Sequence, residues 1–257
     1  MSQPEEHSRP LEHSHEPTAI RRRLADTPQQ SYLRDAILGG IDGCVTTIAV
    51  VAGVAGAGLP GMIAFVLGAA SLVADAFSMG VSNYQGVKSD HDARRRLRQQ
   101  ERRHIEQAPS GEREEIRAIF EAKGFRGDTL ERIVDTITAN RERWIDTMIQ
   151  EEYGLALSGP SPFKAGAATF LVFLVAGALP LIPFLVPVLS GSEYFVASGI
   201  TAILVLFGIG YIKGVIVDLP RLRSGLETLL MGGAAAVIAF LFGYVLEPML
   251  SDLALAR

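Results

Sequence analysis

Two acidic residues of this 257-residue chain stand where charge is costly. Asp42 is the only charged residue between positions 36 and 57, and Asp75 is the only one between positions 61 and 82. An ionisable group within a membrane-spanning helix costs at least ~2.5 kcal/mol on insertion scales, so it normally faces a cavity or a partner. Carboxylates at such positions favour the binding of cations or the transfer of protons.

Further candidate ligands lie beside the two aspartates in helical register. Thr46 lies one turn after Asp42, and Met79 lies one turn after Asp75. The two carboxylates are expected at similar depth, roughly 10 Å inside the same membrane boundary. These four residues predict a divalent-cation site on a transport path. The alternative is a structural aspartate bonded to the backbone where a glycine-rich helix unwinds around Gly39, Gly40 and Gly43.

A second set of candidate ligands lies in the polar segment from Gln85 to Lys164. Glu101 and His104 continue the helical face of Leu97, and carboxylates aimed at a helical core are costly unless they are paired or bind a cation. Glu, His and Met together favour Fe(II), Mn(II), Co(II) or Zn(II) over Mg(II). Chance is the alternative, because the segment holds 15 acidic and 15 basic residues that can pair. The predicted ligands are Glu101, His104, Glu112, Glu115, Met148 and Glu152.

Five stretches with little or no charge must position these side chains. Each is about 20 residues long, the length that a helix needs to cross the hydrocarbon core of a membrane. Five such stretches exclude a water-soluble protein, although 48% hydrophobic and 20% charged residues are close to globular averages. The predicted fold class is an all-α integral membrane protein with five transmembrane helices. The stretches are residues 36–57, 61–82, 165–189, 195–217 and 228–246.

Lys and Arg mark the cytoplasmic side of a membrane protein. All but one of the 24 precede the first span, lie between spans two and three, or flank the turn between spans four and five. The N-terminus is therefore predicted to be cytoplasmic and the C-terminus outside. No signal peptide is visible, and this together with the Arg/Ala-rich composition favours a bacterial inner membrane. The predicted organisation is a disordered cytoplasmic tail with His and Glu residues (1–31), spans one and two (32–84), a cytoplasmic helical metal-binding domain (85–164), spans three to five (165–250) and a short tail (251–257).

The polar segment is predicted to contain four helices. The first continues from span two to Gln107, and Ser110 is expected to cap the second, which stops at Gly124. Asp128 is expected to cap the third, and the fourth covers Glu142–Leu157. The apolar residues are few for a free-standing domain, so the segment is expected to pack on a second copy or on the membrane region. Three prolines are expected to bend span three, namely Pro180, Pro183 and Pro187.

Five short motifs occur in a recognisable order. They are Arg34-Asp35-x-x-x-Gly39-x-x-Asp42-Gly43, Ala76-Phe77-Ser78-Met79-Gly80, Trp144-x-x-x-Met148, Glu152-x-Gly154-Leu155 and Leu179-Pro180-Leu181-Ile182-Pro183. In these motifs the chain resembles the vacuolar iron transporter family, known from plants, yeast, apicomplexan parasites and bacteria. The resemblance runs from about Tyr32 to the end of span five.

The resemblance implies a homodimer with five spans in each subunit and an ion path lined by span one at the dimer interface. It also implies that Fe²⁺ or Mn²⁺ leaves the cytosol in exchange for protons, with no tightly bound cofactor. By position, Asp42 and Met79 are the implied membrane ligands. The implied metal-binding residues of the cytoplasmic domain are Glu101, Glu112, Glu115, Met148 and Glu152.

The chain departs from the family at positions that bear on metal preference. Ser71 stands where plant and yeast members typically have a glutamate, and Asp75 stands where they have a glycine, which moves the acid by one helical turn. His104 stands where the family usually has a glutamate and creates the spacing Glu101-x-x-His104. Di-iron carboxylate bundles need two copies of this spacing, and only one is present. Ile149 replaces a frequent methionine.

The leading hypothesis is a proton-coupled secondary transporter that moves Fe²⁺ and/or Mn²⁺ out of the cytosol, with Co²⁺ and Zn²⁺ as further candidates. The alternatives are a membrane-anchored iron-binding oxidase and a metal-sensing scaffold without transport. ATP-driven transport and hydrolysis are disfavoured, because no glycine-rich nucleotide loop or nucleophile–His–acid set stands out. The single Cys44 excludes an intrachain disulfide and a Cys-rich zinc site. The basic residues are explained by topology, so the expected partners are metal ions, protons, the lipid bilayer and a second copy, and no nucleic acid.

Overall fold

The computed structural model describes residues 14–25 and 31–255 of the chain. It consists of a short N-terminal unit that ends at Ser31 and a main unit that begins at Tyr32. In the N-terminal unit, residues Pro17–Ala25 form helix α1, within the segment predicted to be a disordered tail. Most of the rest of that segment, including His7 and His13, lies outside the described residues.

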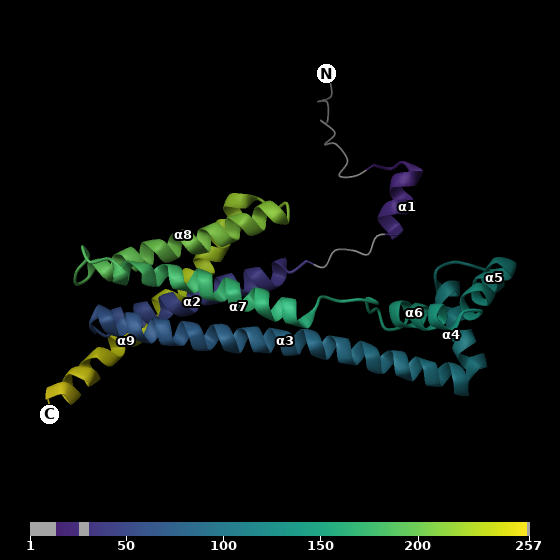
Figure 1. The fold of residues 1–257 in the computed structure, drawn as a ribbon, viewed down its shortest axis with the longest axis horizontal. Helices are drawn as coiled ribbons and strands as arrows, with labels where there is room; N and C mark the ends of the chain where they lie inside the picture. Colours follow the sequence, from purple (N-terminus) through teal and green to yellow (C-terminus); the bar gives the residue numbers. More distant parts are fainter. Residues whose placement is uncertain (1–13, 26–30, 256–257) are drawn as a thin grey trace, which may run out of the picture. The chain divides into compact units, whose positions relative to one another are not determined.

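The main unit contains five helices that are long and apolar enough to cross a membrane, which confirms the predicted five-span architecture (Figure 1). The described residues contain no strand, so the fold is all-α as predicted. The helices are α2 (Leu33–Gly56), α3 (Gly61–Gln107), α7 (Pro162–Ala178) continued by the 3₁₀ helix η1 (Leu179–Leu185), α8 (Glu193–Ile216) and α9 (Arg221–Leu255).

Two ends of these spans differ from regular or expected geometry. Span three changes from α-helix to 3₁₀-helix at Leu179, and Pro180 and Pro183 lie within the 3₁₀ turns. This confirms the expected break, because proline removes a backbone donor and clashes with the preceding turn. At the other end of the chain, α9 continues to Leu255, so the residues predicted as a short C-terminal tail from residue 251 are helical as far as the structure describes them.

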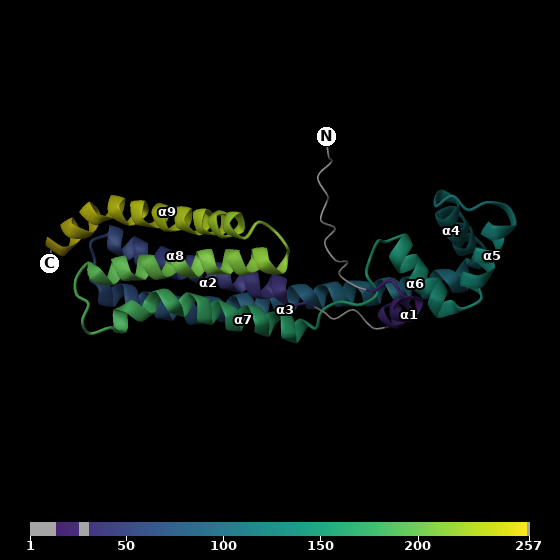
Figure 2. The same cartoon turned by 90° about the horizontal axis from the view of Figure 1, so that it is seen from above.

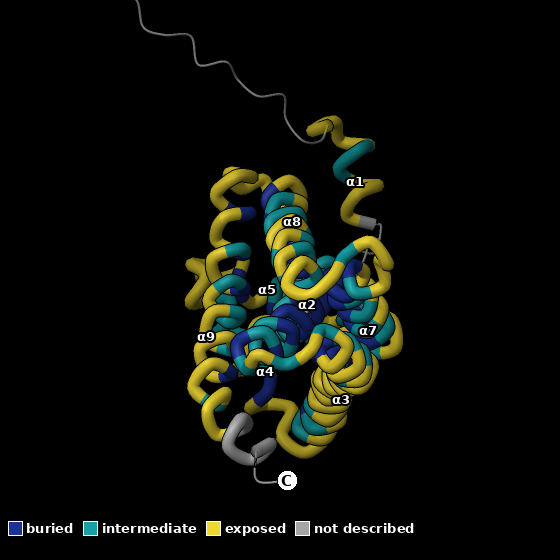
Figure 3. The backbone as a smooth tube through the Cα atoms, turned by 90° about the vertical axis from the view of Figure 1, so that its left-hand side faces the viewer, coloured by how far each residue is buried: buried dark blue, intermediate teal, exposed yellow. Residues whose placement is uncertain are grey.

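Glycines bring the central helix α2 into close contact with α7. A Cβ atom on Gly39 would lie 2.4 Å from the carbonyl oxygen of Thr169, and one on Gly43 would lie 2.3 Å from that of Phe173. In the end-on view α2 occupies the middle of the bundle, with α3, α7, α8 and α9 around it (Figure 3). Because lipid provides no hydrophobic drive between spans, such small-residue contacts are the main packing device. The close approach that Gly39 and Gly43 allow therefore occurs within one chain.

Helix α9 packs on α8 near its start and on α2 near its end (Figure 2). Near the start, a Cβ on Gly210 of α8 would lie 2.5 Å from the backbone oxygen of Ser224. Near the end, a Cβ on Gly243 of α9 would lie 2.1 Å from the backbone oxygen of Gly53 on α2. Because α2 and α9 meet most closely toward the end of α9, a pocket remains between α2, α8 and α9 at the opposite end of α2.

A buried polar network joins α2, α3 and α7 at the end of the bundle that leads to the polar segment. Asn83 Nδ2 donates to Asp35 Oδ1 (2.8 Å) and to Thr169 Oγ1 (2.7 Å). The Thr169 hydroxyl in turn lies 3.2 Å from the Ala165 carbonyl oxygen, which accepts its hydrogen bond. Satisfied polar groups in an apolar bundle fix one relative position of the helices. Asn83 therefore holds α3 at the point where it leaves the spans.

Beyond the spans, α3 continues without interruption and carries three short helices (Figure 1). These are α4 (Pro109–Ala122), α5 (Gly127–Thr138) and α6 (Arg141–Glu151). The predicted caps Ser110 and Asp128 are wrong: Pro109 already occupies the first turn of α4, and α5 begins at Gly127, so both residues lie inside helices. The cap of α6 is Asn140, whose side chain accepts from Arg143 N. The fourth helix ends at Glu151, six residues earlier than predicted.

The short helices share one small apolar cluster and many ion pairs. Arg98 of α3 pairs with Glu142 (2.8 Å) and Asp146 of α6, and Arg117 of α4 pairs with Glu131 (2.8 Å) of α5. These pairs lie at the surface, where solvent and salt screen the charges, so each contributes little to the stability of the segment. The apolar supply is thin, as expected, since the cluster has only six buried members. They are Ile116, Leu130, Val134, Ile137, Trp144 and Met148.

Substituting Gly43 tests the glycine contact between α2 and α7. We expect Gly43→Ala to lower the free energy of unfolding by about 3 kcal/mol, since the backbone of Phe173 must shift to admit the methyl group. Gly86→Ala is the matched control, because nothing lies within 4 Å of its Cβ position, and it should gain about 0.5 kcal/mol of helix propensity. Thermal unfolding in detergent, followed by circular dichroism, compares the two. Equal stability of both variants would contradict the packing described here.

Candidate functional site

Three residues of the polar segment form a compact set of metal-ligating groups. Glu101 and His104 lie one turn apart on α3, and Glu112 comes from the first turn of α4. One ligand atom of each lies within 4.8 Å of those of the other two. His104 Nδ1 is 3.3 Å from Glu112 Oε1 and 3.7 Å from Glu101 Oε1. The break between α3 and α4 at Ala108 brings the third ligand back to the first two.

In each carboxylate of this cluster, one oxygen contacts a neighbouring side chain and the other has no hydrogen-bond partner among the described residues. Glu101 is fully buried, and its Oε1 accepts a hydrogen bond from the Tyr153 hydroxyl at 3.0 Å. Glu112 is 5% exposed, and its Oε1 faces His104. Among the described residues, neither Glu101 Oε2 nor Glu112 Oε2 has a hydrogen-bond partner, although both atoms are buried. Unpartnered buried carboxylate oxygens are costly, and a bound cation would satisfy both.

The electrostatics of the cluster favour a proton or a cation. Burial, followed by the charges of Glu115 and Glu101, raises the pKa of Glu112 from 4.5 to about 7, while His104 opposes the shift. Burial and the charges of Glu101 and Glu115 likewise raise the pKa of Glu152. A raised pKa means that the folded state holds a proton that the unfolded state has released, so Glu112 makes the metal-free fold less stable as the pH rises from about 4.5 through about 7.

The remaining predicted ligands lie at different distances from this cluster. Glu115 and Glu152 are exposed and lie close enough for their charges to act on Glu112. Met148 is fully buried within the apolar cluster of the segment, so the structure gives it a packing role. Its role as a ligand stays a prediction. Ile149, at the position of the frequent methionine, is also buried.

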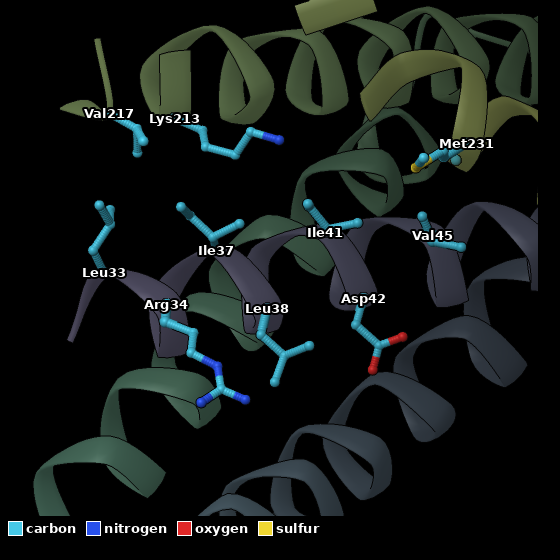
Figure 4. A pocket seen from close by; sticks show the side chains of 11 residues that line it. Leu33, Arg34, Ile37, Leu38, Ile41, Asp42, Val45, Lys213, Val217 and Met231 are labelled. Carbon is cyan, nitrogen blue, oxygen red and sulfur yellow. The ribbon is translucent and has the colours of Figure 1, made fainter. Parts of the chain in front are cut away.

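In the membrane region, Asp42 lines a pocket of about 830 Å³ between α2, α8 and α9. The pocket walls are mostly apolar, with Arg34 and Lys213 as the other charged residues (Figure 4). The Asp42 carboxylate extends from α2 toward the neighbouring ribbon of α3 (Figure 4). Asp42 is half-buried rather than sealed in the bundle. Asp42 therefore borders this pocket, while its carboxylate points away from Lys213 and Met231 on the opposite wall.

Asp42 and Asp75 lie on adjacent helices within electrostatic range of each other. The Ser71 hydroxyl donates to Asp75 Oδ2 at 2.6 Å, so two of the α3 residues that depart from the pattern given above contact each other. Met79 is half-buried against the apolar core of the bundle, and Thr46 is half-buried one turn from Asp42. The two carboxylates thus come from separate spans and lie within range of each other's charge, while ion binding by Asp42, Asp75, Met79 and Thr46 stays a prediction.

Sequence reasoning missed Tyr153 and the role of Ser71. Tyr153 is the unspecified position of the motif Glu152-x-Gly154-Leu155, so the residues on either side of it already indicated that this turn bears on function. Its contact with Glu101, 52 residues earlier, follows only from the packing of α6 on α3. Ser71 lies one helical turn before Asp75, and this spacing alone was sufficient to suggest the hydrogen bond.

Comparison with known proteins points to one family. The model of the VIT family matches residues 33–244. Vacuolar iron transporter 1 of Arabidopsis thaliana is 31% identical over 217 residues, which are 84% of this chain and 86% of that protein. The vacuolar iron transporter of Toxoplasma gondii is 31% identical over 84% of this chain and 74% of its own length. That of Plasmodium berghei is 29% identical over 91% of this chain and 89% of its own length.

The raised pKa of Glu112 predicts a pH dependence of metal binding. A proton on Glu112 competes with the ion, so Co²⁺ should bind the full-length protein about tenfold more weakly at pH 6 than at pH 8. Glu112→Gln should bind more weakly at both pH values and lose most of this dependence. Isothermal titration in detergent measures both constants, and His104→Gln reports separately on the imidazole proton. An unchanged pH dependence in Glu112→Gln would show that another group governs it.

Proposed function

This chain belongs to the VIT family, and on that basis we propose that it is a secondary transporter that moves Fe²⁺, Mn²⁺ or both out of the cytosol in exchange for protons. The observation that carries the mechanism is the pair of carboxylates Asp42 and Asp75, which lie on adjacent spans within range of each other's charge. The names of the relatives support iron as cargo. Mn²⁺ is included as a second cargo ion because carboxylate ligands suit it as well.

The paired carboxylates explain how cation movement can be linked to proton movement. Two negative charges near each other in a membrane are unfavourable unless a cation or a proton compensates them. A divalent ion that binds Asp42 and Asp75 displaces protons, and protons that return displace the ion. Met79 supplies a soft thioether to the path, and Thr46 supplies a hydroxyl. Ser71 orients Asp75 through its hydrogen bond.

The polar segment acts in this mechanism as a collector of ions on the cytosolic side. Its cluster of Glu101, His104 and Glu112 offers two unpartnered carboxylate oxygens and an imidazole nitrogen. Glu115 and Glu152 add negative charge at the rim, and Met148 adds a thioether one turn before Glu152. Because the donor set includes nitrogen, it favours Fe²⁺ over harder ions such as Mg²⁺.

The topology follows from the distribution of Lys and Arg. The N-terminus and polar segment face the cytosol, and the C-terminus lies outside or in the lumen. The membrane is the inner membrane of a bacterium, or the vacuolar membrane in a eukaryote. The functional unit is a homodimer, which the thin apolar cluster of the polar segment supports, since a second copy would bury more of it.

Asp42→Asn tests the transport path. In proteoliposomes with a pH gradient, we expect Fe²⁺ flux to fall at least about tenfold, since loss of one charged ligand costs more than about 1.4 kcal/mol. Met79→Leu keeps the volume and removes the sulfur donor, and should reduce flux by a smaller factor. Asp90→Asn is the control, because Asp90 is exposed on α3 beyond the spans.

Three outcomes separate the possible functions. Wild-type flux in Asp42→Asn would rule out the proposed path. Metal binding without flux in the wild-type protein would identify a sensing scaffold. Oxygen consumption with Fe²⁺ that is lost in Glu101→Ala would favour an oxidase, although the described cluster offers ligands for a single ion.

A further inference from the structure

The backbone of Tyr153 is held by the turn that ends α6. Tyr153 N donates to Met148 O (3.4 Å), and Leu155 N donates to Ile149 O (3.1 Å). Between them Gly154 has φ +65°, a left-handed conformation that glycine adopts without the steric cost of a side chain. The sequence Tyr-Gly-Leu therefore closes the helix and fixes the backbone from which the phenol extends. Tyr153 itself is half-buried.

The phenol of Tyr153 contacts only one of the two carboxylate oxygens of Glu101. The Tyr153 hydroxyl donates to Glu101 Oε1 at 3.0 Å, and the same oxygen is the one nearer His104 Nδ1, at 3.7 Å. Glu101 Oε2 is buried and, within the part of the chain that the structure describes, unpartnered. The hydrogen bond from the Tyr153 hydroxyl thus determines which of the two chemically equivalent oxygens of Glu101 stays without a hydrogen-bond partner among the described residues.

Tyr153 acts in this arrangement as a donor rather than as a ligand. A phenol carries its proton at neutral pH, and the Tyr153 hydroxyl donates that proton to the hydrogen bond with Glu101 Oε1. A neutral phenol bonded to a carboxylate restricts the rotation of that carboxylate without competing for the ion. Groups that hold ligands in this way commonly change metal affinity 10- to 100-fold when they are removed.

We propose that Tyr153 is a positioning residue of the metal cluster, which fixes Glu101 so that its Oε2 and Glu112 Oε2 face the same ion. This role deepens the collecting function proposed for the polar segment and rests on it. Tyr153 would set the affinity of the cluster while the transport path of Asp42 and Asp75 remains unaltered.

Tyr153→Phe tests this role, because it keeps the ring and removes only the hydroxyl. We expect full-length Tyr153→Phe to bind Co²⁺ about tenfold more weakly than the wild type, with a changed visible spectrum that reports altered coordination. Thr147→Val, in the helix α6 that precedes Tyr153, is the matched control, because the Thr147 hydroxyl donates to the backbone oxygen of Arg143 and not to a cluster carboxylate. Its affinity and spectrum should equal those of the wild type.

The double variant Tyr153→Phe/Glu101→Gln separates positioning from general loosening of the fold. If the phenol acts through Glu101, the tyrosine change has no further effect on Co²⁺ affinity once Glu101 is replaced. A tenfold loss that persists in the Glu101→Gln background would overturn the role, and so would wild-type affinity and spectrum in Tyr153→Phe alone. If Glu101→Gln itself binds Co²⁺ as the wild type does, the collecting function fails first, independently of Tyr153.

Discussion

Carboxylates placed away from water are the constraint around which this protein is organised. A buried ionised carboxylate is unfavourable by several kcal/mol unless hydrogen bonds, a proton or a cation compensates it. At three places in this chain a hydrogen bond to the carboxylate supplies this compensation. Asp35 accepts from Asn83 inside the bundle, Asp75 accepts from Ser71, and Glu101 accepts from Tyr153. Only the third arrangement leaves a buried oxygen without a partner among the described residues, and this is where the ligand atoms converge.

The packing of the spans makes such placements possible. Hydrophobic burial does not hold helices together in lipid, so close contact and polar bonds must. Gly39 and Gly43 allow α2 to touch the backbone of α7, and Gly243 allows α9 to touch α2. Because α9 meets α2 closely only toward one end, a hollow remains at the other end, and Asp42 lines it. The position of the pocket is thus a consequence of where the glycines lie along each helix.

The sequence predicted the spans and the long extension of α3 because both depend on local features. Uncharged stretches of membrane length define the spans, and nothing between Ser82 and Gln107 breaks a helix. The predicted caps were wrong because Pro109, with its fixed φ, already occupies the first turn of α4. At the start of α5, Gly127 stands before Asp128 with a left-handed φ of +57° that favours glycine. Glu101 and His104 were found together because they share a helical face. The approach of Glu112 and Tyr153 depends on how separate helices pack, which spacing along the chain does not encode.

One continuous helix links the two candidate sites and sets the distance between them. Asp75 and Glu101 both lie on α3, 26 residues apart, which corresponds to about 39 Å at 1.5 Å per residue. A single ion cannot be shared over that distance, so the cluster and the membrane pair must bind in succession if both serve transport. Asn83 lies between them and ties α3 to α2 and α7, which holds the helix in place at the junction. Metal binding at the cluster would therefore raise the local supply of ions near the bundle, rather than act directly on the geometry of Asp42 and Asp75.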